Sequence, residues 1–326
     1  MSFLTKLPTD RYDPDAFNRF TSGTEFEIGN ARAMAWMSQL AYETDEKDKI
    51  ADILKLWGLV LVEDGVVVEE SKTVLPVAST HCVIASGPKN TIVAFAGTDP
   101  VSLANWITDF DAHLQPPTGV AEGYEAAADI VWPRLQLLLG KCVMPGGKVF
   151  VTGHSLGGAL AALIASRIST RLHIDVDAVY TFGMPRAGNN VFAQSYDDDL
   201  GLRTFRLVHV EDIVPTVAPA SFGFRHVGRY LHCERLGRFD KANLAPDTRS
   251  DLPQFDDGVA KDFTAHLHGS LSAVLSAVAR IKLAVSLLTG IGVSNMRTDP
   301  GGILIELLPP RLRDHMPDRY IGACNG

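Results

Sequence analysis

The stretch that decides the fold is residues 148–162, KVFVTGHSLGGALAA. Its first part, Val149 to Val151, is a run of β-branched and aromatic residues that predicts a buried strand. The run stops at Gly153, and a helix-forming sequence rich in alanine and leucine begins directly after Ser155. The stretch therefore predicts a strand, a sharp turn and a helix.

The turn carries the pattern Gly-x-Ser-x-Gly at residues 153–157. In this setting the pattern is the nucleophile elbow, in which the serine adopts a strained backbone and exposes its hydroxyl above the sheet edge. Gly153 and Gly157 keep the flanking positions free of side chains that would collide. The helix begins beneath Ser155, so its free N–H groups face any oxyanion formed there. The bare pattern is weak evidence, but its context and Gly158 favour the elbow over an ordinary surface turn.

Length and composition describe a globular protein with an ample core. The 326 residues are 46% hydrophobic and 21% charged, and this length allows one large α/β domain or two smaller ones. Of these we expect one domain over residues 1–326. A formal net charge of −8 argues against a nucleic-acid partner, which would select for basic faces. The four cysteines lie far apart without metal-ligand spacing, so we interpret them as free thiols.

The first ten residues, MSFLTKLPTD, become polar before an apolar signal region could form. No cleaved secretory signal is therefore predicted. We expect a cytoplasmic location, with signal-independent secretion as the alternative.

Periodicity and turn signals predict the other elements. The polar segment 1–29 is interpreted as an extended arm, and 30–43 as a helix with apolar residues at helical spacing. Two short strands, 58–62 and 66–69, are expected to form a hairpin around Asp64-Gly65. Further strands are expected at 81–85, from 91 to the glycine at 97, at 177–182 and at 203–210, and helices at 121–139, 156–171 and 190–196.

The strand that ends at Gly97 provides a second candidate for catalysis. In serine hydrolases, one oxyanion donor follows the nucleophile and the other comes from the loop after a neighbouring strand. Thr98 is therefore a candidate donor through its backbone N–H. A plain turn at the strand end is the alternative.

A short apolar helix is predicted just after that loop. Its stripe has spacing i, i+3, i+4 and i+7 and consists of Leu103, Trp106, Ile107 and Phe110. Such a helix beside a catalytic loop is typical of a lid that covers the serine in water and contacts lipid when open. A helix permanently packed on the core explains the same spacing.

The strand at 203–210 ends in Glu211-Asp212. Open α/β sheets gather catalytic groups in loops at the carboxyl ends of their strands. Asp212 is therefore a candidate for the acid that orients a catalytic histidine. Glu211 is the competitor, and a simple turn residue is the bland alternative.

Taken in chain order, several segments resemble the fungal-type class 3 lipases. They are FAGT at 95–98, NWITD at 105–109, VTGHSLGG at 151–158, TFGMPRAGN at 181–189, HVEDIVP at 209–215 and FGFRH at 222–226. The resemblance covers about residues 85–230. It departs from the family at Ala96, where arginine is usual, and at 121–124, where AEGY replaces His-x-Gly-Phe.

This resemblance implies an α/β-hydrolase fold, with a mostly parallel central sheet, helices on both faces and a lid after the oxyanion strand, over about residues 100–112. It also implies site residues. Ser155 would be the nucleophile, Asp212 the acid, and Thr98 and Leu156 would form the oxyanion hole.

The catalytic histidine has to be chosen among ten. The family places it near the C-terminus in an Asp-His pair followed by an aromatic residue, and Asp314-His315 with Tyr320 resembles that motif. We predict His315, with His266 next and an exposed tail histidine as the bland reading. His154 is excluded by position, because a residue adjacent to the elbow serine points away from its hydroxyl.

Between the matched region and His315 lies an expected insertion, about residues 232–308, with an apolar helical region at 271–293. Arg280 and Lys282 near its middle would each cost about 2.5–3.5 kcal/mol in a bilayer, so no transmembrane span is expected. Packing on the core is favoured over an acyl-binding wall or a lipid-surface helix.

The residues and the resemblance together predict a serine carboxylic-ester hydrolase, most simply a lipase that cleaves acylglycerols through an acyl-enzyme. No metal or organic cofactor is expected. The expected partners are an acylglycerol or other lipid ester and a transient lipid surface. The alternatives are an esterase or phospholipase on the same scaffold, or an inactive hydrolase-like protein that binds lipid.

Overall fold

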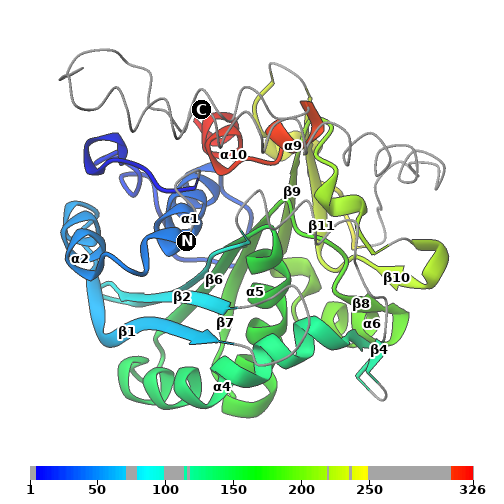
Figure 1. Ribbon diagram of the computed structural model, residues 1–326, viewed down its shortest axis with the longest axis horizontal. Coiled ribbons are helices and arrows are strands. Elements are labelled where there is room, and N and C mark those ends of the chain that lie inside the picture. Colours follow the sequence, from blue (N-terminus) through cyan, green and yellow to red (C-terminus); the bar gives the residue numbers. More distant parts are fainter. Residues whose placement is uncertain are drawn as a thin grey trace, which may run out of the picture.

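A seven-stranded sheet organises the chain, in the strand order β1-β2-β3-β6-β7-β9-β11 (Figure 1). Strands β3, β6, β7, β9 and β11 run parallel, whereas β1 and β2 are antiparallel to their neighbours. The expected mostly parallel sheet is confirmed. The strands are β1 Val60–Glu70, β2 Ser79–Ser86, β3 Asn90–Phe95, β6 Lys148–His154, β7 Val176–Phe182, β9 Thr204–His209 and β11 Arg229–Cys233.

This computed structural model describes residues 5–70, 79–98, 114–115, 118–218, 220–234, 237–248 and 310–325. Several expectations lie outside the described residues. They are the lid at 100–112 with Leu103, Trp106, Ile107 and Phe110, the apolar region 271–293, and His266.

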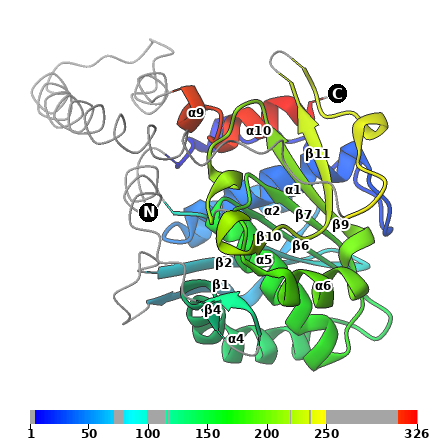
Figure 2. The same cartoon turned by 90° about the vertical axis from the view of Figure 1, so that its right-hand side faces the viewer.

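Helices cover both faces of the sheet (Figure 2). The alternation of β6 shows why, since Val149 and Val151 contribute to the core beneath α4 and α5, whereas Phe150 contributes to the core beneath α1 and α10. Strands buried on both sides need apolar residues at every position, which explains the continuous hydrophobic run. The helices are α1 Ile28–Leu40, α2 Lys47–Leu56, α4 Glu122–Cys142, α5 Leu156–Arg167, α6 Asn190–Asp199, α9 Pro310–Arg313 and α10 Pro317–Cys324.

The predicted hairpin at Asp64-Gly65 is wrong. Both halves of the segment belong to β1 and pair with β2, with Leu61 opposite Ala85 and Val66 opposite Val83. The residues between them form a bulge, in which Asp64 adopts a φ of 57°. The left-handed backbone that an Asp-Gly signal indicates is present, but it kinks one strand instead of joining two.

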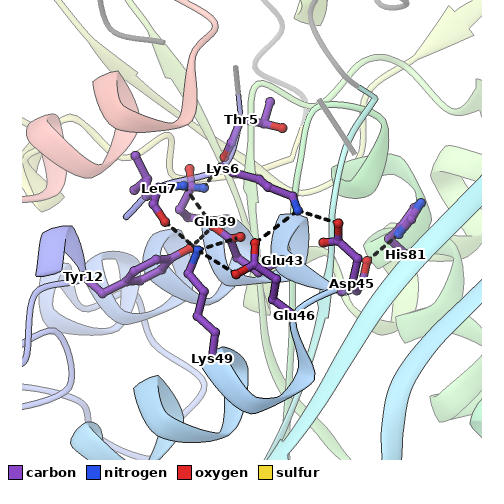
Figure 3. A network of polar contacts seen from close by, with 11 residues as sticks. Thr5, Lys6, Leu7, Tyr12, Gln39, Glu43, Asp45, Glu46, Lys49 and His81 are labelled. Atoms are coloured by element: carbon purple, nitrogen blue, oxygen red, sulfur yellow. Dashed lines mark hydrogen bonds and ion pairs between the residues drawn. The ribbon is translucent and has the colours of Figure 1, made fainter. Parts of the chain in front are cut away.

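The segment before α1 folds against the body of the protein instead of extending as an arm. Phe26 is fully buried. A polar network also fixes the segment (Figure 3), because the buried carboxylate of Glu43 accepts hydrogen bonds from Leu7 N and Tyr12 Oη, both at 2.9 Å, and pairs with Lys49 Nζ at 2.9 Å. Glu43 ends the short 3₁₀ helix η2, Ala41–Glu43, so the network anchors the turn that follows α1.

The C-terminal helix α10 returns to the N-terminal half of the chain and packs against α1 (Figure 1). The first residues of the expected insertion still belong to the sheet, since β11 continues to Cys233. Further on, Phe239 N donates to Ala323 O at 3.0 Å, and the Phe239 ring stacks on Tyr320. The described part of the insertion therefore packs against α10.

A second, four-stranded sheet has the order β10-β8-β5-β4. Its strands are β4 Leu114–Gln115, β5 Val120–Ala121, β8 Gly188–Asn189 and β10 Phe224–Arg225.

Among the residues that the structure describes, no helix is both long and apolar enough to cross a bilayer.

Candidate active site

Ser155 lies between β6 and α5 with φ 60° and ψ −131°. The predicted strand, turn and helix are confirmed, and the serine has the strained backbone of an elbow. Close packing makes the flanking glycines necessary: a Cβ on Gly153 would collide with the Gly157 carbonyl, and a Cβ on Gly157 would lie 2.5 Å from Phe95 O.

Asp212 and His315 meet at the carboxyl edge of the sheet. His315 Nδ1 lies 2.7 Å from Asp212 Oδ2, and both side chains are buried. Asp212 follows β9, and its other oxygen, Oδ1, accepts from Val214 N at 2.9 Å. Residues 103 positions apart in the chain thus form a hydrogen bond with the geometry of a histidine and the acid that orients it.

A third donor, Tyr320 on α10, also binds Asp212. Its hydroxyl lies 2.6 Å from Oδ2 and accepts from His209 N at 3.1 Å. Burial, together with the charge of Asp212, raises the pKa of Tyr320 well above its ordinary value, so the hydroxyl keeps its proton and donates it. The sequence motif includes this aromatic residue, but nothing in the motif indicates its contact with the acid.

Gly183 forms the wall beside the Asp212–His315 pair. It follows β7 with φ 61°, and a Cβ there would lie 2.6 Å from Asp212 Oδ2 and 2.8 Å from His315 Nδ1. A side chain at this position would therefore push the two groups apart. Gly183 lies in the segment TFGMPRAGN, which resembles the lipase family, but nothing in that segment indicates its contact with the site.

Two polar atoms without a hydrogen-bond partner in the described part of the chain belong to residues at this end of the sheet. Ser155 Oγ and His315 Nε2 are buried, and neither has a hydrogen-bond partner within the described ranges. Ser155 N bonds Phe182 O at 2.8 Å, while the His315 ring lies against the next residue, Gly183. Buried polar atoms in folded proteins are rarely left unpaired, and such atoms are frequent at catalytic sites. Catalytic hydrogen bonds are often loose before substrate binds.

The two predicted oxyanion donors flank the serine. Leu156 is the first residue of α5, so its N–H has no acceptor within the helix. Thr98 follows Gly97, where a Cβ would lie 2.7 Å from Ser155 Cβ, so the loop after β3 runs beside the serine. Their roles as donors stay predictions.

The competing acid, Glu211, does not face the histidine. Its carboxylate is exposed and lies 3.6 Å from Arg311 Nε. Its backbone N–H points instead to Asp314, with 3.4 Å between Glu211 N and Asp314 Oδ2. Of the two acids after β9, only Asp212 contacts His315.

His154 has both ring nitrogens occupied. Nδ1 lies 2.7 Å from Tyr42 Oη, and Nε2 lies 2.7 Å from the backbone oxygen of His315. Burial and the neighbouring His315 lower the pKa of His154 well below its ordinary value, so the ring is neutral. Neither nitrogen is available to Ser155, in agreement with its exclusion as the base.

Buried neutral histidines predict a loss of stability in acid. Burial lowers the pKa of His154 and His226 well below the ordinary 6.5, and that of His81 to about 4. Below about pH 6.5 these histidines therefore bind protons in the unfolded chain but stay neutral in the folded chain. The stability is complete above that pH and decreases as pH falls, by up to about 1.4 kcal/mol per pH unit for each such histidine.

Urea unfolding between about pH 7 and pH 5, where most carboxylates stay ionised, measures this slope. His226→Gln should reduce the slope. Ser155→Ala, which removes no titrating side chain, should keep it. Equal free energies of unfolding at both ends of the range would contradict the prediction.

A mostly parallel sheet with a serine elbow after its middle strand, an acid after β9 and a histidine just before α10 together have the arrangement of the α/β-hydrolase fold. Lipase II from Rhizopus niveus has this fold and aligns with a TM-score of 0.55 at 24% identity, over 71% of this chain and 89% of that one. A family model described as lipase (class 3) matches residues 92–222 of this chain.

Two relatives are secreted fungal enzymes by name. A secreted mono- and diacylglycerol lipase of Malassezia restricta is 31% identical over 197 residues, 56% of this chain and 60% of that enzyme. A secreted mono- and diacylglycerol lipase of Fusarium solani is 34% identical over 149 residues, 42% of each chain. The chain thus spans less than two thirds of these curated relatives.

The expected cytoplasmic location is contradicted by these relatives, which are named as secreted. That expectation depended only on the polar character of the first ten residues. The polarity of so short a segment says little about where a folded enzyme works.

Proposed function

We propose that the protein is a serine carboxylic-ester hydrolase. The observation that carries this proposal is the arrangement at the sheet edge. His315 bonds Asp212 through Nδ1, and at the same end of the sheet His315 Nε2 and Ser155 Oγ are buried without a hydrogen-bond partner among the described residues. The fold and the match of residues 92–222 to the lipase (class 3) model support the same conclusion.

In the proposed mechanism, Ser155 Oγ attacks the ester carbonyl while His315 Nε2 accepts its proton. Asp212 holds the tautomer of His315 that has its proton on Nδ1 and stabilises the imidazolium. The backbone N–H groups of Leu156 and Thr98 bind the oxyanion. The imidazolium then protonates the leaving alcohol, and water repeats the sequence on the acyl-enzyme to release the acid.

The proposed substrates are acylglycerols. The relatives in Malassezia and Fusarium are named mono- and diacylglycerol lipases, which favours glycerol esters over small soluble esters. The apolar sequence at 103–110 supports the same choice, because the proposed lid would need apolar residues that can contact lipid.

The proposed domain organisation is a single domain over residues 1–326, with an insertion at about residues 232–308.

A fluorophosphonate probe tests the reaction class. We expect labelling of the wild type at Ser155 and no labelling of Ser155→Ala. An unreactive serine in the folded wild type would instead favour the inactive lipid-binding protein.

Emulsified mono-, di- and triacylglycerols, compared with p-nitrophenyl esters of increasing chain length and with a phospholipid, test the substrate class. We expect turnover of acylglycerols and a preference for chains longer than acetate. A maximum at acetate with no cleavage of emulsions would indicate an esterase, and preferred cleavage of the phospholipid would indicate a phospholipase.

Gly183→Ala is expected to lower kcat by about 10²-fold, because the new Cβ would separate Asp212 from His315 and misplace the base. Turnover of a p-nitrophenyl ester measures the effect. Gly140→Ala is the matched control, since a Cβ there meets nothing within 4 Å and the exposed helix position should gain stability. Equal activity of the two variants would argue against a close packing requirement at Gly183.

A further inference from the structure

His154 is the elbow residue that the proposed mechanism does not use, yet it lies against the catalytic base. The centroids of the His154 and His315 rings are 4.5 Å apart, with the ring planes 36° from parallel. His154 Nε2 lies 2.7 Å from the His315 backbone oxygen. The ring therefore contacts both the side chain and the main chain of the residue that would take the serine proton.

The hydrogen bonds of His154 fix its tautomer. A carbonyl oxygen can only accept, so Nε2 carries the proton that is donated to His315 O. In a neutral ring the other nitrogen is then an acceptor, and Tyr42 Oη, 2.7 Å from Nδ1, must donate to it. The Tyr42 hydroxyl thereby selects the tautomer that can bond the base segment.

Tyr42 also contacts the loop after β3, which contains the predicted oxyanion donor Thr98. A Cβ on Gly97 would lie 2.6 Å from Tyr42 Oη and 2.7 Å from the backbone oxygen of His154. Tyr42 itself is fully buried in the turn η2, which the Glu43 network anchors. One tyrosine therefore lies between the turn η2, the loop after β3 and His154.

We propose that Tyr42 and His154 are positioning residues. Tyr42 donates to His154, His154 donates to the His315 backbone, and this hydrogen-bonded chain holds the base in place relative to the serine elbow and the loop after β3. The catalytic part of this proposal rests on the proposed ester hydrolysis. The hydrogen-bonded chain itself does not.

Nitrogen-15 NMR of the histidine-labelled wild type tests the chain without any assay of activity. At neutral pH we expect one neutral imidazole with its proton on Nε2 that is absent from the spectrum of His154→Gln. Tyr42→Phe should shift its Nδ1 signal, because the hydroxyl that donates to it is gone. Tyr196→Phe, which removes a buried hydroxyl bonded to Thr204, should leave the signal unchanged. A proton on Nδ1, or no response to Tyr42→Phe, would overturn the proposal.

Kinetics test the effect on the base. His154→Phe keeps a ring but loses the donor to His315 O, and we expect kcat for ester hydrolysis to fall about tenfold or more with little change in KM. His154→Gln keeps an N–H at a similar distance from the backbone and should restore most of the rate. Equal rates for the two variants, whether both low or both normal, would contradict a positioning role.

These outcomes distinguish this proposal from the proposed function. If the wild type cleaves no ester but shows the expected His154 tautomer, the proposed function is wrong and the hydrogen-bonded chain from Tyr42 through His154 to His315 is supported. If esters are cleaved and the tautomer is the other one, the reverse holds.

Discussion

Replacing Ser155 by alanine is expected to lower kcat for ester cleavage by about 10⁶-fold, to a rate close to that of the residual reaction without a nucleophile. The substitution removes the atom that attacks the carbonyl and leaves the His315–Asp212 pair without a group to activate. Hydrolysis of a p-nitrophenyl ester, followed over long times, measures the loss. The purified variant is used at a concentration far above the lowest one at which the wild type gives a detectable rate.

We expect Ser155→Ala to keep the fold and its stability. Ser155 Oγ is buried without a hydrogen-bond partner within the described residues, so its removal takes away an unsatisfied polar atom, and the free energy of unfolding should stay equal or rise. Ser38→Ala is the matched control, since it removes another buried serine hydroxyl, which bonds Ala35 O on α1, and should keep turnover. Ester cleavage that survives in Ser155→Ala would refute the mechanism.

Local patterns were sufficient to predict the elbow. The strand β6, the turn at Ser155 and helix α5 all follow from contiguous residues, because an apolar run, a glycine turn and an alanine-rich run each specify their own backbone. The same holds for Asp212, whose position after β9 could be predicted from the end of an apolar run. In a parallel sheet the carboxyl ends of the strands lie at one edge, so the sequence also predicts that Ser155 and Asp212 lie at the same edge.

The histidine was a different problem. No local pattern joins His315 to a residue 103 positions earlier, and only the resemblance of its Asp-His motif singled it out. The contacts of Tyr42 with His154 and of Gly183 with the pair were not predicted at all, since they depend on how close the packed segments come. The hairpin error has a related cause, because the Asp64-Gly65 signal specifies a backbone kink but not the partner of the flanking residues.

Asp212→Asn is expected to lower kcat by about 10⁴-fold, or about 5.5 kcal/mol of barrier. The reason is the count of donors around the carboxylate. Oδ1 accepts from Val214 N, and Oδ2 accepts from both His315 Nδ1 and Tyr320 Oη. An asparagine that keeps its oxygen on Val214 N turns its NH₂ group toward His315, and we expect this orientation. It forces His315 into the tautomer that cannot accept the serine proton.

The matched control for this substitution is Asp197→Asn, at a half-buried acid that accepts from Gly228 N at 2.8 Å and lies outside the site. It should change kcat by no more than a few fold, because an asparagine oxygen can still accept the bond from Gly228 N, and the residue is remote from Ser155 in the proposed mechanism. Nitrogen-15 NMR of His315 gives an independent reading, since its proton should leave Nδ1 in Asp212→Asn and stay in Asp197→Asn. If Asp212→Asn retained a rate within tenfold of the wild type while Ser155→Ala was inactive, the buried pair would be structural. Another carboxylate, with Glu211 the first to test, would then have to orient the base.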